Sequence, residues 1–161
     1  QSLLEARRQR VELHLPEPPP VVLADERRVQ QVLVNLLSNA NKYGPEGDTI
    51  DIAAQVVDSQ VRVSVTDHGP GIPSEEQPHL FEAYFRSAMA RQLTPGVGLG
   101  LAIVKAIVEA HGGRVGVDSA PQRGTTVWFT LPLAGSPVGE RSALVEELAS
   151  ALAAGPTGEA A

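Results

Sequence analysis

Two asparagines and a lysine on one face of a predicted helix are the residues best suited to bind an oxygen-rich ligand. Asn35 and Asn39 are four positions apart and Lys42 follows three later, so their side chains project from neighbouring turns. Asparagine is a poor helix former, because its side chain competes for the backbone. Amide oxygens suit a hard cation, whereas amide and ammonium groups donate to phosphate. A solvated polar face would explain the same pattern, and the helix alone does not decide.

A run of alternating glycines, Gly96, Gly98 and Gly100, opens a second predicted helix. Glycines let the backbone approach an anion, and the free N–H groups at the start of a helix favour its negative charge. The spacing is not that of the dinucleotide-binding fingerprint, and no Gly-Lys-Ser/Thr follows as in a Walker A loop. A phosphate-binding loop and a flexible turn before a helix both remain open.

Asp67 ends a predicted strand and is followed closely by Gly69 and Gly71. A carboxylate at this point can accept a hydrogen bond from an exocyclic amine, and the glycines would let a flat base lie against the backbone. An aspartate that only shapes the turn is the alternative. We expect the neighbouring His68 to point away from such a site. No metal-ligand spacing relates the other histidines, which are His14, His79 and His111.

Hydrophobic periodicity predicts the elements that position these residues. Apolar residues recur at three- and four-residue intervals over 29–43, which indicates a helix, and Asp25 is its expected N-cap. The second helix is expected to end at His111, before two glycines. The expected buried stripe of this second helix is Leu99, Ala102, Ile103, Ala106, Ile107 and Ala110. A short helix is expected within 75–84. The predicted strands cover residues 11–15, 21–23, 49–57, 61–65, 114–118 and 125–131.

This order of strands and helices predicts an α+β sandwich, in which a mixed sheet carries its helices on one face. We interpret residues 1–10 as a linker or the end of a preceding helix, and 11–133 as the domain. Residues 134–161 are interpreted as a C-terminal extension that contains a linker, a possible helix over 142–153 and a disordered end. Residues 73–95 have no clear period, and a loop of this length is usually functional or mobile.

Composition limits the class of protein. The chain has 161 residues, which suits one domain with a sizeable core. A net charge of -6 argues against nucleic-acid binding as the main task. Cysteine is absent, so the sequence has no disulfide framework and no thiolate metal site. No apolar run approaches the length of a membrane helix, and the start at Gln1 suggests a fragment of a longer chain.

Taken together, these motifs resemble the catalytic ATP-binding domain of bacterial sensor histidine kinases, in the GHKL group with the Bergerat ATP-binding fold. Residues 35–43 match the N box, 67–72 the G1 box, 81–86 the F box and 96–104 the G2 box, and 124–126 resemble the last Gly-Thr element. The resemblance covers roughly 11–132. It implies a two-layer α/β sandwich with a mixed, mostly antiparallel sheet, and a mobile ATP lid over 73–95.

The resemblance also implies roles for individual residues. Asn35 would bind Mg²⁺ and, with Lys42 and Arg86, would be catalytic, while Asp67 would accept a hydrogen bond from the adenine N6. The residues expected to contact ATP are Asn39, Tyr43, Asp67, Gly69, Gly71, Ile72, Phe81, Gly96, Gly98, Leu99, Gly100, Leu101 and Thr125. In the F box the aromatic order is swapped to Tyr84-Phe85. Asn41 stands where a small or apolar residue is common, and the resemblance gives it no role.

One position separates the reaction types of this group. Gyrase-type and chaperone ATPases have a glutamate base where this chain has Asn35, a neutral amide that cannot take a proton from water. The resemblance therefore implies transfer of the ATP γ-phosphate to a histidine on a separate dimerisation domain, with a response regulator as an indirect partner. It implies a cytoplasmic domain with no nucleic-acid or membrane contact, and a membrane anchor elsewhere in a longer parent stays open. A nucleotide-binding regulatory module without phosphotransfer and a GHKL ATPase are the alternatives.

Overall fold

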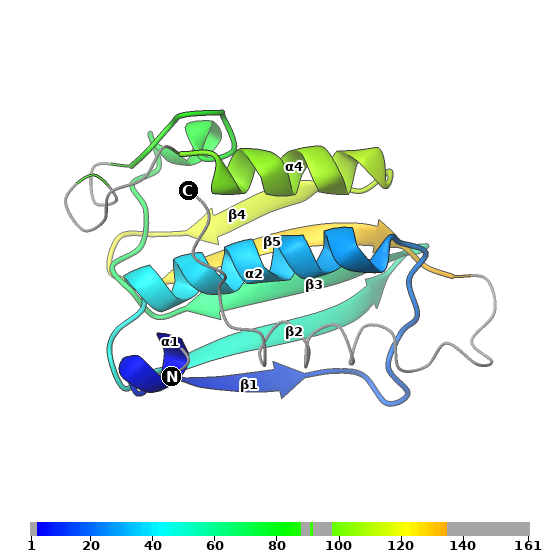
Figure 1. Ribbon diagram of the computed structural model, residues 1–161, viewed down its shortest axis with the longest axis horizontal. Coiled ribbons are helices and arrows are strands. Elements are labelled where there is room, and N and C mark those ends of the chain that lie inside the picture. The colour runs from blue at the N-terminus through cyan, green and yellow to red at the C-terminus, as the bar shows by residue number, and fades with distance from the viewer. Residues whose placement is uncertain (1–2, 88–90, 92–97, 135–161) are drawn as a thin grey trace.

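Five strands form a single sheet in the computed structural model, which describes residues 3–87, 91 and 98–134. Their order in the sheet is β1-β2-β3-β5-β4 (Figure 1). The strands are β1 Arg10–His14, β2 Thr49–Val57, β3 Gln60–Asp67, β4 Val115–Ser119 and β5 Thr125–Pro132. β1 pairs with β2 in parallel, whereas the other neighbouring pairs are antiparallel. The mixed, mostly antiparallel sheet that the sequence predicts is confirmed.

Two long helices, α2 Glu26–Tyr43 and α4 Gly100–Ala110, lie on the same face of this sheet (Figure 1). The described part of the chain also contains the short helix α1 Leu3–Ala6 before β1 and the 3-10 turn η1 Gln77–His79. The predicted two-layer architecture with helices on one face is therefore confirmed. No helix in this part of the chain combines the length and the apolar character needed to cross a bilayer.

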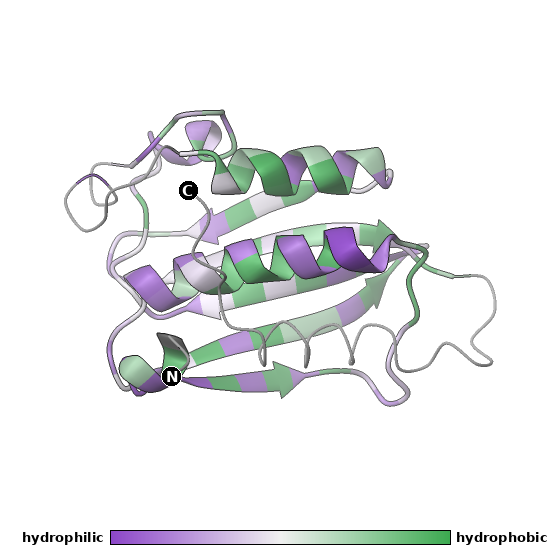
Figure 2. Cartoon of the chain, viewed as in Figure 1, coloured by the Kyte–Doolittle hydropathy of each residue, from purple (hydrophilic) through white to green (hydrophobic). Residues whose placement is uncertain are grey.

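The helix α2 follows its sequence pattern closely. Its expected N-cap is present, because the Asp25 carboxylate accepts a hydrogen bond from the Arg28 N–H at 3.3 Å. At the other end the Gly44 N–H donates to the Ala40 carbonyl at 2.8 Å. The six residues of the predicted apolar stripe are all buried: Val29, Val32, Leu33, Leu36, Leu37 and Ala40. Figure 2 shows the alternation of hydrophilic and hydrophobic residues along this helix.

The predicted buried stripe of the helix α4 is partly wrong. The buried residues are Gly100, Val104, Ile107 and Val108, whereas the predicted Ala106 and Ala110 are exposed. The reason is that Lys105 and Glu109 are the only charged residues of α4, which is mostly green in Figure 2, so periodicity cannot select the face that meets the sheet.

Two expected elements between the main ones are shorter than predicted. Residues 21–23 form only an isolated bridge, between Val22 and Leu133, because the three prolines that precede them have no backbone N–H to extend a ladder. The helix expected within 75–84 is limited to the 3-10 turn η1.

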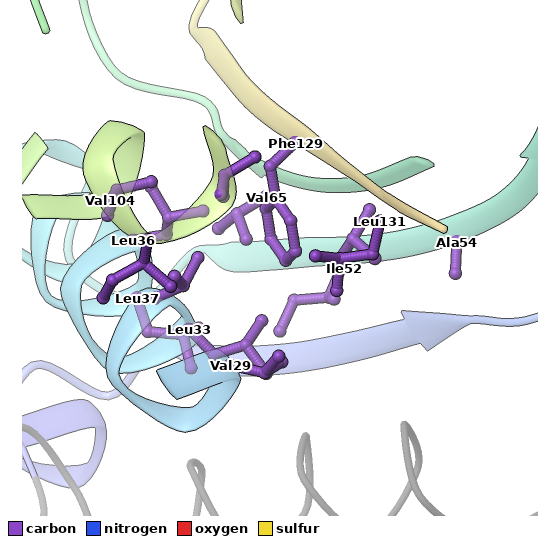
Figure 3. Close-up of a cluster of buried hydrophobic side chains, with 14 of the residues drawn as sticks. Val29, Leu33, Leu36, Leu37, Ile52, Ala54, Val65, Val104, Phe129 and Leu131 are labelled. Atoms are coloured by element: carbon purple, nitrogen blue, oxygen red, sulfur yellow. The ribbon is translucent and has the colours of Figure 1, made fainter. Parts of the chain in front are cut away.

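The core lies between the two helices and the sheet (Figure 3). Leu33 and Leu36 of α2 and Val104 of α4 pack toward Ile52 and Phe129 of the sheet, and each of these side chains is at most 2% exposed. Complete burial of one such side chain stabilises a fold by roughly 1.5–3 kcal/mol. The core therefore fixes the two helices against one face of the sheet.

The opposite face of the sheet carries a different set of side chains. Trp128 on β5 lies directly over Gly116 on β4, where any side chain would overlap the indole ring. The Arg62 guanidinium lies 4.2 Å from the centroid of this ring and pairs with the Asp118 carboxylate at 3.1 Å. Trp128 and its partner Ser64 alternate with the core residues, so this cluster faces away from both helices.

Candidate functional site

An open pocket lies where the C-terminal half of α2, the start of α4 and the adjoining ends of β3 and β5 meet. Apolar side chains and a few polar groups line it, as is typical of small-molecule sites. The lining residues are Leu36, Asn39, Ala40, Tyr43, Val65, Asp67, Pro70, Gly71, Ile72, Leu80, Phe85, Arg86, Ser87, Gly98, Gly100, Leu101, Thr125 and Val127.

The pocket brings together most of the residues that sequence reasoning selected. The predicted site residues that line it are Asn39, Tyr43, Asp67, Gly71, Ile72, Arg86, Gly98, Gly100, Leu101 and Thr125. Those that do not line it are Asn35, Lys42, Gly69, Phe81 and Leu99. Gly96 lies outside the described residues. All five sequence motifs thus contribute residues to one cavity.

Asp67 ends β3 at the floor of the pocket and is only 7% exposed. Its Oδ1 atom accepts a hydrogen bond from the Gly69 N–H at 2.9 Å. Burial raises the pKa of this carboxyl, and the opposing effects of the Gly69 hydrogen bond and of the His68 charge are smaller. A buried carboxyl group at the wall of a pocket can supply a specific hydrogen bond to a ligand.

The turn after Asp67 is shaped by Gly71 and held by partners far along the chain. Gly71 has φ of 77°, and a side chain there would overlap the Ala120 carbonyl. The Ile72 N–H donates to the Ser119 Oγ at 2.8 Å. The Gln77 side chain donates to the carbonyls of Ile72 at 2.9 Å and Ser119 at 2.8 Å. Hydrogen bonds within the protein therefore hold this end of the pocket in shape.

The other end of the pocket is formed where α2 meets the start of α4. The Asn35 Nδ2 donates to the Gly100 carbonyl at 3.4 Å, which ties the two helices together. Leu99 precedes α4 without a side-chain cap, so its side chain does not occupy the first N–H groups of this helix. Gly98 has φ of 77°, and its carbonyl accepts the Tyr84 N–H at 2.9 Å. The free N–H groups at the start of α4 suit an anion such as phosphate.

His68 points away from the pocket, as expected. Its Nδ1 lies 3.1 Å from the Thr49 carbonyl and its Nε2 lies 3.3 Å from an Asp51 carboxylate oxygen. Asp51 also contacts His14. Glu12, His14 and Asp51 form a candidate cation site, which is empty, and their potential ligand atoms lie within 4.8 Å of one another. Sequence spacing missed this group because its members lie on two paired strands. They are exposed or half-buried at the edge of the sheet, away from the pocket.

Sequence reasoning also missed the side chains that support the pocket from behind. Ser119 and Gln77 belong to no motif, and each makes a hydrogen bond to a residue more than forty positions away. Gln9 and Asn41 are both buried and hydrogen-bonded to each other. Only Asn41 carried a signal in the sequence, since it is a polar residue at a position where an apolar or small one is common in the N box.

The pocket geometry agrees with comparison to known proteins. Residues 24–135 match the family model described as histidine kinase-, DNA gyrase B-, and HSP90-like ATPase. The chain belongs to this ATPase family. It is an ATP-binding domain with the fold of histidine kinase catalytic domains, as the resemblance implied.

Relatives within the family are sensor kinases. The adaptive-response sensory kinase SasA of Synechocystis sp. is 45% identical over 120 residues, which cover 74% of this chain and 31% of that protein. SasA of Nostoc sp. is 44% identical over 126 residues, which cover 78% of this chain and 31% of the relative. The chain thus spans about a third of the length of the curated relatives it matches.

Solved structures show the same fold. The mycobacterial sensor histidine kinase MprB has a TM-score of 0.73 and 36% identity, with 81% of this chain and 88% of that chain covered. Full-length ShkA, solved in complex with AMPPNP, has a TM-score of 0.73 and 34% identity, with 83% of this chain and 27% of that chain covered.

Proposed function

We propose that this domain binds Mg-ATP and transfers the γ-phosphate to a histidine on a separate dimerisation domain, as part of a two-component signalling protein. The observation that carries the proposal is a single pocket with two chemically different ends. A buried acceptor, Asp67, lies at one end, and Gly98 and Gly100 line the other. Asn35 lies next to this second end, outside the lining itself, and donates to the Gly100 carbonyl. ATP likewise has two chemically different ends, the base and the phosphates.

Asp67 would select the base. Its carboxyl group would accept a hydrogen bond from the exocyclic amine of adenine, whereas guanine presents a carbonyl oxygen at the equivalent position and would be repelled. The apolar lining from Val65, Leu80 and Val127 would pack against the ring. Since Asp67 is already fixed by Gly69, recognition would require little rearrangement at this end.

The residues at the other end fit a magnesium ion held jointly with phosphates. The Asn35 amide uses its nitrogen for the Gly100 carbonyl, so its oxygen is the atom that would meet a cation. One neutral protein oxygen suits Mg²⁺, which normally keeps several waters and phosphate oxygens as ligands. When bound, the ion would neutralise phosphate charge. Asn35 would hold it, while Asn39 and Lys42 would reach the phosphates.

Phosphoryl transfer would depend on positioning and charge rather than on a protein base. Arg86 lines the pocket and would offer a guanidinium to the phosphates, together with backbone N–H groups at the start of α4. Asn35 is a neutral amide and would not activate water, so hydrolysis would be slow compared with transfer to a histidine. The imidazole would come from a partner domain, and a response regulator would receive the phosphate afterwards.

Calorimetry tests the nucleotide part of this proposal. We expect wild-type protein to bind ATP with micromolar affinity, more tightly with Mg²⁺, and to bind GTP at least tenfold more weakly. Asp67→Ala should reduce ATP affinity by about 10- to 100-fold, because a hydrogen bond to a charged group contributes roughly 1.5–3 kcal/mol.

Circular dichroism must show that the Asp67→Ala variant remains folded. Phosphotransfer would then be measured by adding a histidine-containing dimerisation domain with labelled ATP. A folded wild-type domain that binds no ATP would overturn the proposal. ATP binding without transfer to any such domain would favour the regulatory module that lacks phosphotransfer.

A further inference from the structure

The last turn of α2 is capped by side chains from the segment before β1. Helices often end in a glycine with positive φ, which lets backbone N–H groups satisfy the final carbonyls. Gly44 instead has φ of -70°, and its own N–H donates back to the Ala40 carbonyl. The carbonyls that follow, from Asn41 onward, therefore need donors from elsewhere in the molecule.

Gln9 supplies these donors. Its Nε2 lies 3.3 Å from the Asn41 carbonyl, 3.3 Å from the Gly44 carbonyl and 3.1 Å from the Pro45 carbonyl. Its Oε1 accepts the Asn41 Nδ2 at 2.6 Å, so the two amides hold each other. Gln9 is 6% exposed and Asn41 is 4% exposed. Polar groups buried to this extent are costly to leave without partners.

Arg7 and the local backbone hold the same segment in place. The Arg7 guanidinium donates to the Asn41 carbonyl. The Gly47 N–H donates to the Arg7 carbonyl at 2.9 Å, and the Gln9 N–H donates to the Leu4 carbonyl at 2.9 Å. We refer to Arg7, Gln9 and Asn41 together as the amide clasp.

The clasp is separated from the pocket residue Asp67 only by Gly44. A Cβ atom placed on Gly44 would lie 3.3 Å from the Gln9 Nε2 on one side and 3.4 Å from the Asp67 Cβ on another. A side chain on Gly69, in the turn that Asp67 fixes, would overlap the Tyr43 carbonyl. Gly44, the C-cap residue of α2, is thus packed between the clasp and the proposed adenine acceptor.

We propose that Gln9 is a positioning residue for ATP binding, and that through the clasp the seating of residues 7–9 and the affinity for ATP depend on each other. When the segment is seated, the last turn of α2 places Asn39 and Tyr43 in the pocket wall and supports Asp67. When it is displaced, the final carbonyls of α2 lose their donors and this turn frays. Binding linkage is reciprocal, so ATP must in turn favour the seated segment. The inference rests on the proposed function only in taking ATP as the ligand.

The competing explanation is that the clasp only stabilises the fold. The test therefore needs a control variant that is destabilised to a similar extent at a site outside the clasp. Gln9→Met keeps an unbranched side chain of similar length but removes every amide hydrogen bond. Val61→Ala is the matched control, because Val61 is fully buried near the start of β3, whereas Asp67 ends that strand. Both variants should lower the melting temperature.

ATP affinity, measured well below both melting temperatures, separates the two explanations. We expect Gln9→Met to weaken ATP binding about tenfold, within the usual range of coupling between sites. Val61→Ala should bind like wild type. Hydrogen exchange of the Gly44 and Gly47 amides should slow when ATP is added to wild type, and should respond less in Gln9→Met.

Equal ATP affinity in Gln9→Met and wild type would overturn the inference while leaving the proposed function intact. A wild-type protein that binds no ATP would instead remove the proposed function itself. Should Gln9→Met fail to fold, Arg7→Met serves as the second variant, since Arg7 is only half-buried. It should weaken ATP binding in the same direction, and an unchanged affinity in that variant would also overturn the inference.

Discussion

The two ends of the pocket are built by different means. At the Asp67 end, the turn is held by Ser119 and Gln77, whose hydrogen bonds reach across the fold. At the Asn35 end, the walls are the side of one helix and the start of another, and a hydrogen bond from the Asn35 amide to the Gly100 carbonyl links them. The first end is held by hydrogen bonds within the protein. The second presents groups whose natural partners are a cation and phosphate oxygens.

This difference predicts where a substitution will affect stability and where it will affect chemistry. Removing a support at the Asp67 end leaves buried polar groups without partners, so it should cost both stability and affinity. Removing a group at the Asn35 end should cost reactivity and leave the fold nearly unchanged, because that group is only partly buried and its helix is held by an apolar stripe. Three substitutions test this contrast.

The largest effect is expected for Asn35→Lys. An ammonium would replace the amide oxygen and repel Mg²⁺, so phosphotransfer should fall by at least about 100-fold, as when a charge-stabilising group is lost from an active site. Lysine is a good helix former, so the melting temperature should change little. Transfer to an added dimerisation domain is measured with labelled ATP. Wild-type rates in this variant would refute the metal assignment, and an Asn35→Asp variant should also lose transfer.

An intermediate effect is expected for Ser119→Ala. The Ser119 Oγ accepts the Ile72 N–H at 2.8 Å and lies 2.9 Å from the Gly124 carbonyl, so its loss leaves two backbone groups unsatisfied. We expect a loss of roughly 1–3 kcal/mol in the free energy of unfolding, measured with urea, and a several-fold loss of ATP affinity. Ser64→Ala, on the opposite face of the sheet, is the control. If both variants bind ATP like wild type, the Asp67 end is not fixed by this bond.

The smallest effect is expected for Asp67→Asn, and it depends on pH. Burial raises the pKa of Asp67 above the ordinary aspartate value of 3.8, so the folded state favours the protonated form. Its contribution to stability is therefore greatest at low pH and is lost as pH rises through the folded pKa. Asparagine keeps an acceptor for the Gly69 N–H without the buried charge. The variant should be more stable than wild type at neutral pH by roughly 0.5–1 kcal/mol.

Urea unfolding at a series of pH values measures this difference. The two stability curves should converge on the acid side and separate as pH rises above 3.8. A constant difference, or a variant less stable than wild type at neutral pH, would contradict the assignment. ATP affinity should fall in the same variant, which would show that Asp67 is retained for binding at a cost in stability.

The parts of the site that sequence could predict are those determined by local pattern. The stripe of α2, the strand that ends at Asp67 and the glycines before α4 are each recognisable within a short window. The buried face of α4 could not be predicted, because nearly every residue of that helix is apolar. The support from Ser119 could not be predicted either, since the bond to Ile72 exists only once β4 and β5 are paired and the chain has returned to this edge. The contact between Gln9 and Asn41 depends in the same way on how β1 aligns with β2.

The placement of Trp128 gives the protein an optical signal that is separate from ligand binding. It is the single tryptophan of the chain, and it stacks beside Arg62 on the face of the sheet that points away from the helices. Its neighbour Val127 lines the pocket on the opposite side. Indole fluorescence should therefore stay nearly constant during a nucleotide titration and shift when β3, β5 and β4 separate in urea. Nucleotide occupancy can thus be followed by calorimetry and unfolding by tryptophan fluorescence in the same protein.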